Sequence, residues 1–200
     1  MEANLIQEQW DEEISLIKQR IVKLSNRQDL IAFYGSSSIR LWTSMQEDLY
    51  PLNSLNLGFG GSTYKDCLYY FSEVFDSLSP RTIILYGGDN DIANGETPMA
   101  IQRYFQAIVE KIQQKYPTKA LAVMSIKPSP SRAGYLDQIA QTNKLLRHYI
   151  QTVGGTYIDI YSAMLDENLQ PKAELFLEDA LHLNALGYKL WTTVLKKHLM

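Results

Sequence analysis

The chain has 200 residues, with 19 Lys and Arg against 22 Asp and Glu, so its formal net charge is −3. This length fits one domain, and a domain of this size needs no disulfide or metal to fold. A hydrophobic fraction of 46% excludes a disordered chain, and the single cysteine excludes both an intramolecular disulfide and a Cys-based zinc site. The mild acidity argues against nucleic acid as a partner.

Residues 5–25 show helical periodicity. Apolar side chains recur at spacings of three and four, at Ile6, Trp10, Ile14, Ile17, Ile21 and Leu24. We expect a single domain over residues 1–200, with an amphipathic N-terminal helix in residues 1–28 packed on its body. The sequence leaves open whether this helix also mediates a homodimer.

The N-terminus lacks the features of a secretory signal, since it has neither a basic start nor an apolar run. No stretch approaches the ~18 apolar residues of a membrane span. These features predict a cytoplasmic protein without a membrane span.

Five short apolar segments predict buried strands, and helical periodicity fills the intervals between them. The predicted strands are residues 30–34, 55–59, 82–86, 120–126 and 156–160. The predicted helices that follow are residues 64–78, 98–116, 135–152 and 187–199. Strands that alternate with helices predict an α/β fold, in which a parallel sheet has helices on both faces.

Ligands of such sheets bind outside the carboxyl ends of the strands. Three predicted strands end in segments with small polar residues or glycine, namely residues 35–38, 60–63 and 88–91, and the fourth precedes the polar loop 127–132. We expect these segments to meet at one edge of the sheet. The segment 179–182 joins them because it precedes the last predicted helix.

Among the three histidines, His182 is the best candidate for a general base. His148 lies in a helical run and His198 is third from the C-terminus, whereas His182 lies in a non-repetitive stretch three residues after Asp179. On a helical turn these two side chains share a face, so Asp179 could orient the imidazole. A capping aspartate beside an incidental histidine explains the same spacing.

The other segments are equally ambiguous when each is taken alone. A serine just after a strand is typical of an exposed nucleophile, but Gly-Ser-Ser-Ser is also an ordinary turn. Gly61 could bring a backbone amide close to a ligand or form a tight turn. The Asn90 amide could donate to an oxyanion or close an Asx-turn.

Taken together and in order, residues 33–39, 56–62, 88–91 and 179–182 resemble four sequence blocks of the SGNH hydrolases, also called GDSL-type lipases or esterases. The first block resembles a subgroup with Gly-Ser-Ser-Ser. The resemblance implies a three-layer α/β/α, flavodoxin-like sandwich with a five-stranded parallel sheet. It also implies a serine hydrolase that cleaves carboxylic esters and needs no cofactor and no metal.

The resemblance further implies a role for each matching residue. Ser37 would be the nucleophile, His182 the general base and then the general acid, and Asp179 the residue that orients His182. The backbone amides of Ser37 and Gly61 and the side chain of Asn90 would form the oxyanion hole. The family's usual Gly-Asp-Ser is Gly-Ser-Ser here, so Ser36 and Ser38 remain alternative nucleophiles.

The substrate is less well defined by the sequence. Lys127 or Arg132 could bind an anionic group of the substrate, or both could lie in a solvated loop. The absence of a long amphipathic lid favours small or short-chain esters, such as acetylated carbohydrates or aryl esters. The alternatives are a lysophospholipase or thioesterase of the same family, and a non-catalytic ligand-binding module on the same fold.

Overall fold

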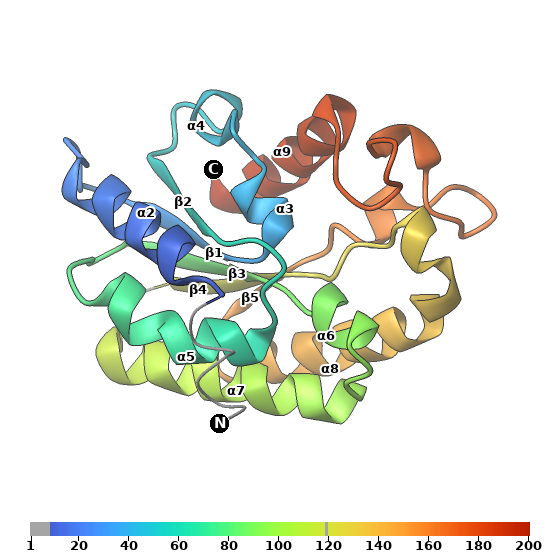
Figure 1. Cartoon of the computed structure of the whole chain (residues 1–200), viewed down its shortest axis with the longest axis horizontal. Helices are drawn as coiled ribbons and strands as arrows, with labels where there is room; N and C mark the ends of the chain where they lie inside the picture. Colours follow the sequence, from blue (N-terminus) through green and yellow to red (C-terminus); the bar gives the residue numbers. More distant parts are fainter. Residues whose placement is uncertain (1–8, 119) are drawn as a thin grey trace.

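The computed structural model, which describes residues 9–118 and 120–200, places a parallel sheet between two layers of helices (Figure 1). The strands are β1 (Ile31–Gly35), β2 (Ser54–Gly58), β3 (Thr82–Tyr86), β4 (Ala120–Met124) and β5 (Thr156–Ile158). The α-helices are α2 (Asp11–Val22), α3 (Ser37–Arg40), α4 (Met45–Asp48), α5 (Tyr64–Phe75), α6 (Asp89–Ala93), α7 (Pro98–Lys115), α8 (Leu136–Thr152) and α9 (Ala185–Leu199). Three short 3₁₀ helices, η1 (Pro130–Tyr135), η2 (Ser162–Met164) and η3 (Ala173–Leu175), complete the elements.

The sheet has five strands in the order β2-β1-β3-β4-β5, and every neighbouring pair is parallel. This confirms the predicted fold class. Gly35, the last residue of β1, pairs with Gly58 of β2 and with Tyr86 of β3, so these three strands end at the same level. The segments that follow them therefore start at one edge of the sheet. The fifth strand ends at Ile158, before its predicted end, and the Ile160 amide donates instead to Ser125 Oγ.

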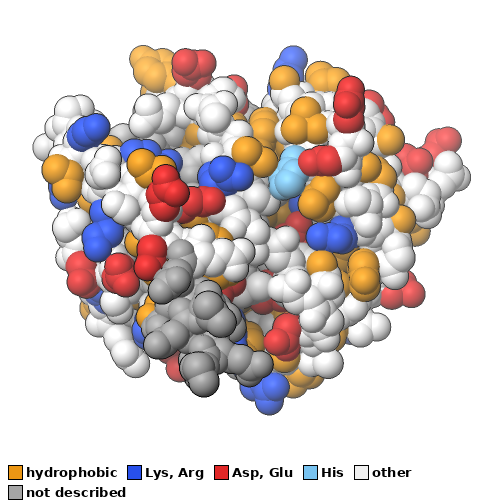
Figure 2. Space-filling model, in the orientation of Figure 1, with side chains coloured by type: hydrophobic (Ala, Val, Ile, Leu, Met, Phe, Trp, Pro, Cys, Tyr) orange, Lys and Arg blue, Asp and Glu red, His pale blue; other side chains and the backbone are white. Residues whose placement is uncertain are grey.

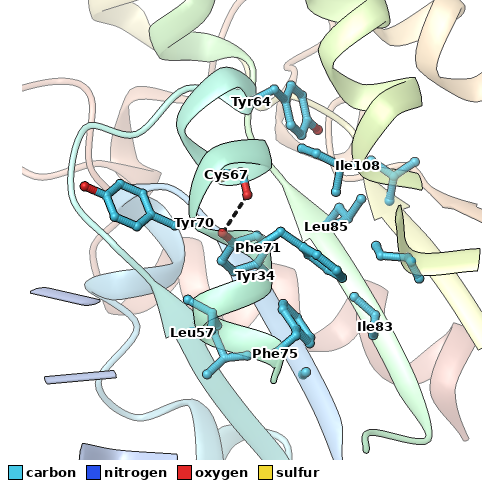
Figure 3. Packing of buried hydrophobic residues seen from close by; sticks show 14 of the residues in the cluster. Tyr34, Leu57, Tyr64, Cys67, Tyr70, Phe71, Phe75, Ile83, Leu85 and Ile108 are labelled. Carbon is cyan, nitrogen blue, oxygen red and sulfur yellow. Dashed lines mark hydrogen bonds between the residues drawn. The ribbon is translucent and has the colours of Figure 1, made fainter. Parts of the chain in front are cut away.

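Alternate side chains of the central strands enter two separate cores. Tyr34 of β1 packs on the face covered by α5, α7 and α8, among Phe71 and Phe75 of α5 (Figure 3). The Tyr34 hydroxyl donates to the Cys67 carbonyl oxygen at 2.8 Å, so this buried polar group is satisfied. Phe33, the preceding residue, points to the opposite face and packs against Trp42. This alternation explains why β1 is apolar throughout.

The opposite face is covered mainly by α9, together with the short helices α3 and α4 (Figure 1). Trp191 of α9 is fully buried against Tyr86 of β3 and Trp42. Tyr188, one turn earlier, stacks on Trp42, and its hydroxyl donates to the Ser38 carbonyl oxygen at 3.0 Å. These contacts fix α3, and with it the segment that follows β1, against α9.

Helix α2 is amphipathic and buries Ile14, Ile17 and Ile21 in the core shared with α5. It begins at Asp11, and Ile6 of the predicted helix lies outside the described residues. In the described part of the chain, no helix is long and apolar enough to cross a membrane.

Candidate active site

The first candidate segment starts where β1 turns directly into α3. A Cβ atom at Gly35 would lie 1.7 Å from the Tyr86 carbonyl oxygen, so only glycine allows β1 and β3 to approach this closely. The chain then enters α3, which begins at Ser37. This sharp strand-to-helix turn presents the Ser37 side chain at the carboxyl edge of the sheet.

His182 lies between Ser37 and Asp179 and contacts both. Its Nε2 atom is 3.0 Å from Ser37 Oγ, and its Nδ1 atom is 2.6 Å from Asp179 Oδ2. An ionised carboxylate only accepts hydrogen bonds, so Nδ1 carries the proton in the neutral imidazole and Nε2 is free to accept one. The structure therefore brings together three of the predicted site residues in a hydrogen-bonded chain.

The Asp179 carboxylate also holds the turn that carries His182. Its Oδ1 atom accepts the backbone N–H groups of Leu181 and His182, both at 2.9 Å. The hydrogen bonds from the His182 backbone and imidazole lower the Asp179 pKa to about 2, with a smaller contribution from the Leu181 backbone. Asp179 is therefore ionised at neutral pH. Ser131 of η1 donates its N–H to the Ala180 carbonyl oxygen at 3.0 Å and ties this turn to the segment that follows β4.

The three adjacent serines differ in environment. Ser36 and Ser38 are buried, and neither of their hydroxyls is a partner of His182 among the described residues. Ser37 is partly exposed, and its hydroxyl is the one within hydrogen-bond distance of His182. The geometry thus favours Ser37 over the two alternatives that the sequence left open.

The expected oxyanion donors lie on segments next to Ser37. The Ser37 amide is the first of α3, a position where the N–H has no partner within the helix. Gly61 has φ +70°, a conformation that favours glycine, and a Cβ there would meet nothing within 4 Å. Asn90 donates through Nδ2 to the Ser62 carbonyl oxygen at 3.0 Å, which leaves its second amide hydrogen for a ligand.

Asp91 holds the loop of Gly61 from the same short helix, a function that the sequence analysis did not assign. Its Oδ1 atom accepts the Tyr64 backbone N–H at 3.0 Å, at the start of α5. Helix α6 therefore contacts the loop on both sides of Thr63, through Asn90 and Asp91. Burial disfavours the charged form and raises the Asp91 pKa to about 7. The one feature of the sequence that could have pointed to Asp91 is its position directly after Asn90.

The raised Asp91 pKa predicts that stability falls as the pH rises toward neutral. Between the unfolded pKa and about 7, the folded chain holds one more proton than the unfolded chain, so this group lowers the free energy of unfolding by about 1.4 kcal/mol per pH unit. Denaturant unfolding of the wild type and of Asp91→Asn from about pH 5 to about pH 6.5 measures this slope. Equal slopes in the two proteins would contradict the prediction.

Lys127 is a predicted site residue whose side chain the structure buries in an ion pair. Its side chain is 1% exposed, and Nζ donates to Asp89 Oδ2 at 2.8 Å, so it cannot bind an anionic substrate group as the sequence suggested. Burial opposes the charge on Asp89, but attraction to Lys127 and their hydrogen bond outweigh it and lower the Asp89 pKa. An unpaired buried lysine is costly, which explains the pairing. Arg132 is only partly buried and stays a candidate.

One face of the molecule carries charged side chains of both signs. Figure 2 shows a histidine side chain beside a hollow in one face of the molecule, with acidic and basic side chains on both sides of it. This face presents α3 and the loops before α9 in the orientation of Figure 1.

Comparison with known proteins gives one family match. The family model described as the GDSL-like lipase/acylhydrolase family matches residues 30–190. Platelet-activating factor acetylhydrolase IB subunit alpha2 of Homo sapiens is 25% identical over 132 residues, which are 64% of this chain and 57% of that protein. The match thus spans little more than half the length of this relative.

Solved structures share the fold at lower sequence identity. A Streptococcus pneumonia protein described as a platelet activating factor superposes with a TM-score of 0.84 and 21% identity, covering 99% of this chain and 98% of that one. An acetyl xylan esterase gives a TM-score of 0.72 and 18% identity, covering 86% of this chain and 100% of that one. These likenesses show a common three-layer architecture.

Proposed function

Because this chain belongs to the GDSL-like lipase/acylhydrolase family, we propose that it hydrolyses carboxylic esters through an acyl-enzyme on Ser37. The family membership confirms the resemblance to the GDSL-type hydrolases, while the subgroup with Gly-Ser-Ser-Ser stays a prediction. The observation that carries the proposal is the chain of hydrogen bonds from Ser37 Oγ through His182 to Asp179, at 3.0 and 2.6 Å. A nucleophile, a base and a group that orients the base are what acyl transfer requires.

In the first half of the reaction, Ser37 Oγ attacks the ester carbonyl carbon while His182 Nε2 takes the hydroxyl proton. The imidazolium is stabilised by the ionised Asp179. The carbonyl oxygen becomes an oxyanion that accepts hydrogen bonds from the Ser37 and Gly61 amides and from Asn90 Nδ2. His182 then returns the proton to the leaving alcohol, and the acyl group stays on Ser37.

In the second half, a water molecule takes the place of the alcohol. His182 Nε2 removes a proton from this water as it attacks the acyl-enzyme carbonyl, and the same donors hold the second oxyanion. Collapse of the intermediate breaks the bond to Ser37 Oγ, which regains its proton from His182. The free acid leaves, and Ser37 and His182 are again in their starting protonation states at the end of the cycle.

We propose small or short-chain esters as substrates, with acetyl esters first among them. The curated relative is an acetylhydrolase by name, and one structural neighbour is an acetyl xylan esterase, so two proteins of similar sequence or fold are named for acetyl esters. A lysophospholipase or thioesterase activity is the competing function at the same site. A ligand-binding module without turnover would have no use for the aligned base and its orienting carboxylate.

Hydrolysis of para-nitrophenyl esters from acetate to palmitate tests this substrate class. We expect kcat/KM to be highest for acetate and to fall with chain length. Active-site titration with a fluorophosphonate should label one serine per chain. A rate that peaks at long chains would instead support the lysophospholipase or thioesterase. Absence of turnover at every chain length, together with absence of fluorophosphonate labelling, would support the binding module and contradict the proposed function.

A further inference from the structure

We infer that Trp10, just before α2, is a positioning residue for the oxyanion hole and acts on the peptide group that carries the Gly61 N–H. The Trp10 indole Nε1 donates to the Gly60 carbonyl oxygen at 2.5 Å. This carbonyl and the Gly61 N–H belong to the same peptide group. The inference rests on the proposed function, because it assigns a task to Trp10 only if the Gly61 amide binds an oxyanion.

The geometry of a trans peptide makes this contact directional. The C=O and N–H bonds of one peptide lie in a plane and point in opposite directions. An indole that holds the Gly60 oxygen therefore turns the Gly61 N–H to the side away from Trp10. Two consecutive glycines can adopt many backbone conformations, so the orientation of the peptide between them depends on contacts such as this one. Trp10 thus selects one orientation of the donor.

The same contact strengthens the donor electronically. A hydrogen bond to the carbonyl oxygen of an amide draws electrons through the conjugated C–N bond and makes the N–H at the other end more positive. The Trp10 side chain is 6% exposed and its ring packs edge-on against Phe59 at 6.0 Å between centroids, so water does not compete freely for the bond.

Glu13, one helical turn further along α2, fixes the preceding peptide. Its Oε2 atom accepts the Gly60 backbone N–H at 2.6 Å. The two peptide groups that flank the Gly60 Cα are thus both held. Glu13 of α2 binds the N–H of the first, and Trp10 binds the C=O of the second. Glu13 also lies 3.6 Å from Arg40 Nε at the end of α3, the helix that begins at Ser37. Helix α2 therefore bridges the loop of Gly61 and the helix of Ser37.

Trp10→Phe tests the inference, because phenylalanine keeps an aromatic ring against Phe59 and lacks the N–H donor. We expect kcat for para-nitrophenyl acetate to fall about tenfold, less than the ~10²–10³ lost when a whole oxyanion donor is removed, with KM within about twofold. Lys18→Met is the matched control on α2, since Lys18 pairs with Glu73 of α5 and does not contact Gly60. It should keep the wild-type kcat.

The Glu13 variants separate positioning from a loss of folding. Glu13→Ala removes the acceptor for the Gly60 N–H and should lower kcat, whereas Glu13→Gln retains a carbonyl oxygen there and should recover most of it. Thermal unfolding of every variant is measured alongside. A wild-type kcat in Trp10→Phe, or the same decrease in Lys18→Met, would overturn the inference.

A spectroscopic measurement keeps this inference distinct from the proposed function. In an amide spectrum of isotope-labelled protein, Trp10→Phe should shift the Gly61 N–H signal toward that of a less polarised amide, and Lys18→Met should not. An unmoved Gly61 signal would overturn the inference even in an active enzyme. An absence of Ser37-dependent turnover in the wild type would instead overturn the proposed function.

Discussion

Ser37→Ala is expected to lower kcat for para-nitrophenyl acetate by about 10⁶ while changing the free energy of unfolding by less than about 0.5 kcal/mol. The large loss follows because without Oγ no acyl-enzyme can form, and the base and oxyanion donors act only through that nucleophile. The small effect on stability follows because Ser37 is partly exposed and its hydroxyl bonds only to His182 among the described residues. Steady-state kinetics and denaturant unfolding measure the two quantities.

The neighbouring serines provide the control for this substitution. Ser36→Ala and Ser38→Ala remove buried hydroxyls that do not pair with His182 in the described part of the chain, so kcat should stay close to that of the wild type. Peptide mapping after fluorophosphonate treatment should locate the label on Ser37. Turnover that survives in Ser37→Ala and disappears in Ser36→Ala would contradict the assignment of the nucleophile.

The elements that position the site follow from short-range patterns in the sequence. The apolar run of β1 ends at Gly35, and parallel strands joined by helices must place their carboxyl ends at one edge. That rule is enough to expect Ser37 and Asn90 together, although they are distant in sequence. His182 follows no strand, and it was expected there because its segment precedes the last helix. The distances between them, and the choice of Ser37 among three serines, depend on the direction in which α3 leaves the strand.

The wrong prediction for Lys127 and the missed role of Trp10 have a common physical cause. Both depend on a contact with a residue far away in the sequence. Lys127 follows a strand in a polar loop, which is typical of an exposed residue, and only its pairing with Asp89, 38 residues earlier, keeps it buried. Trp10 falls in an apolar helical stripe, which is typical of a core residue. Its ring is core, but its N–H reaches Gly60, 50 residues later, and periodicity carries no information about that direction.

His182→Ala should lower kcat about as much as loss of the nucleophile, by about 10⁶, whereas Asp179→Asn should lower it by about 10⁴. His182 moves the proton in every step, so nothing replaces it. The asparagine side chain in Asp179→Asn would keep an oxygen that accepts the Leu181 and His182 backbone N–H groups and so preserve the turn. Its NH₂ group, however, would donate to Nδ1 and place the imidazole proton on Nε2, where it blocks acceptance from Ser37.

Asp166→Asn is the matched control for this last substitution. The Asp166 Oδ1 atom also accepts two backbone N–H groups, those of Asn168 and Gln170 at 2.8 Å each, but Asp166 has no histidine partner among the described residues. If Asp179 only capped its turn, both Asp→Asn variants would leave kcat unchanged. Because Asp179 also fixes the tautomer of His182, we expect only Asp179→Asn to lose activity while both variants unfold at nearly the wild-type temperature.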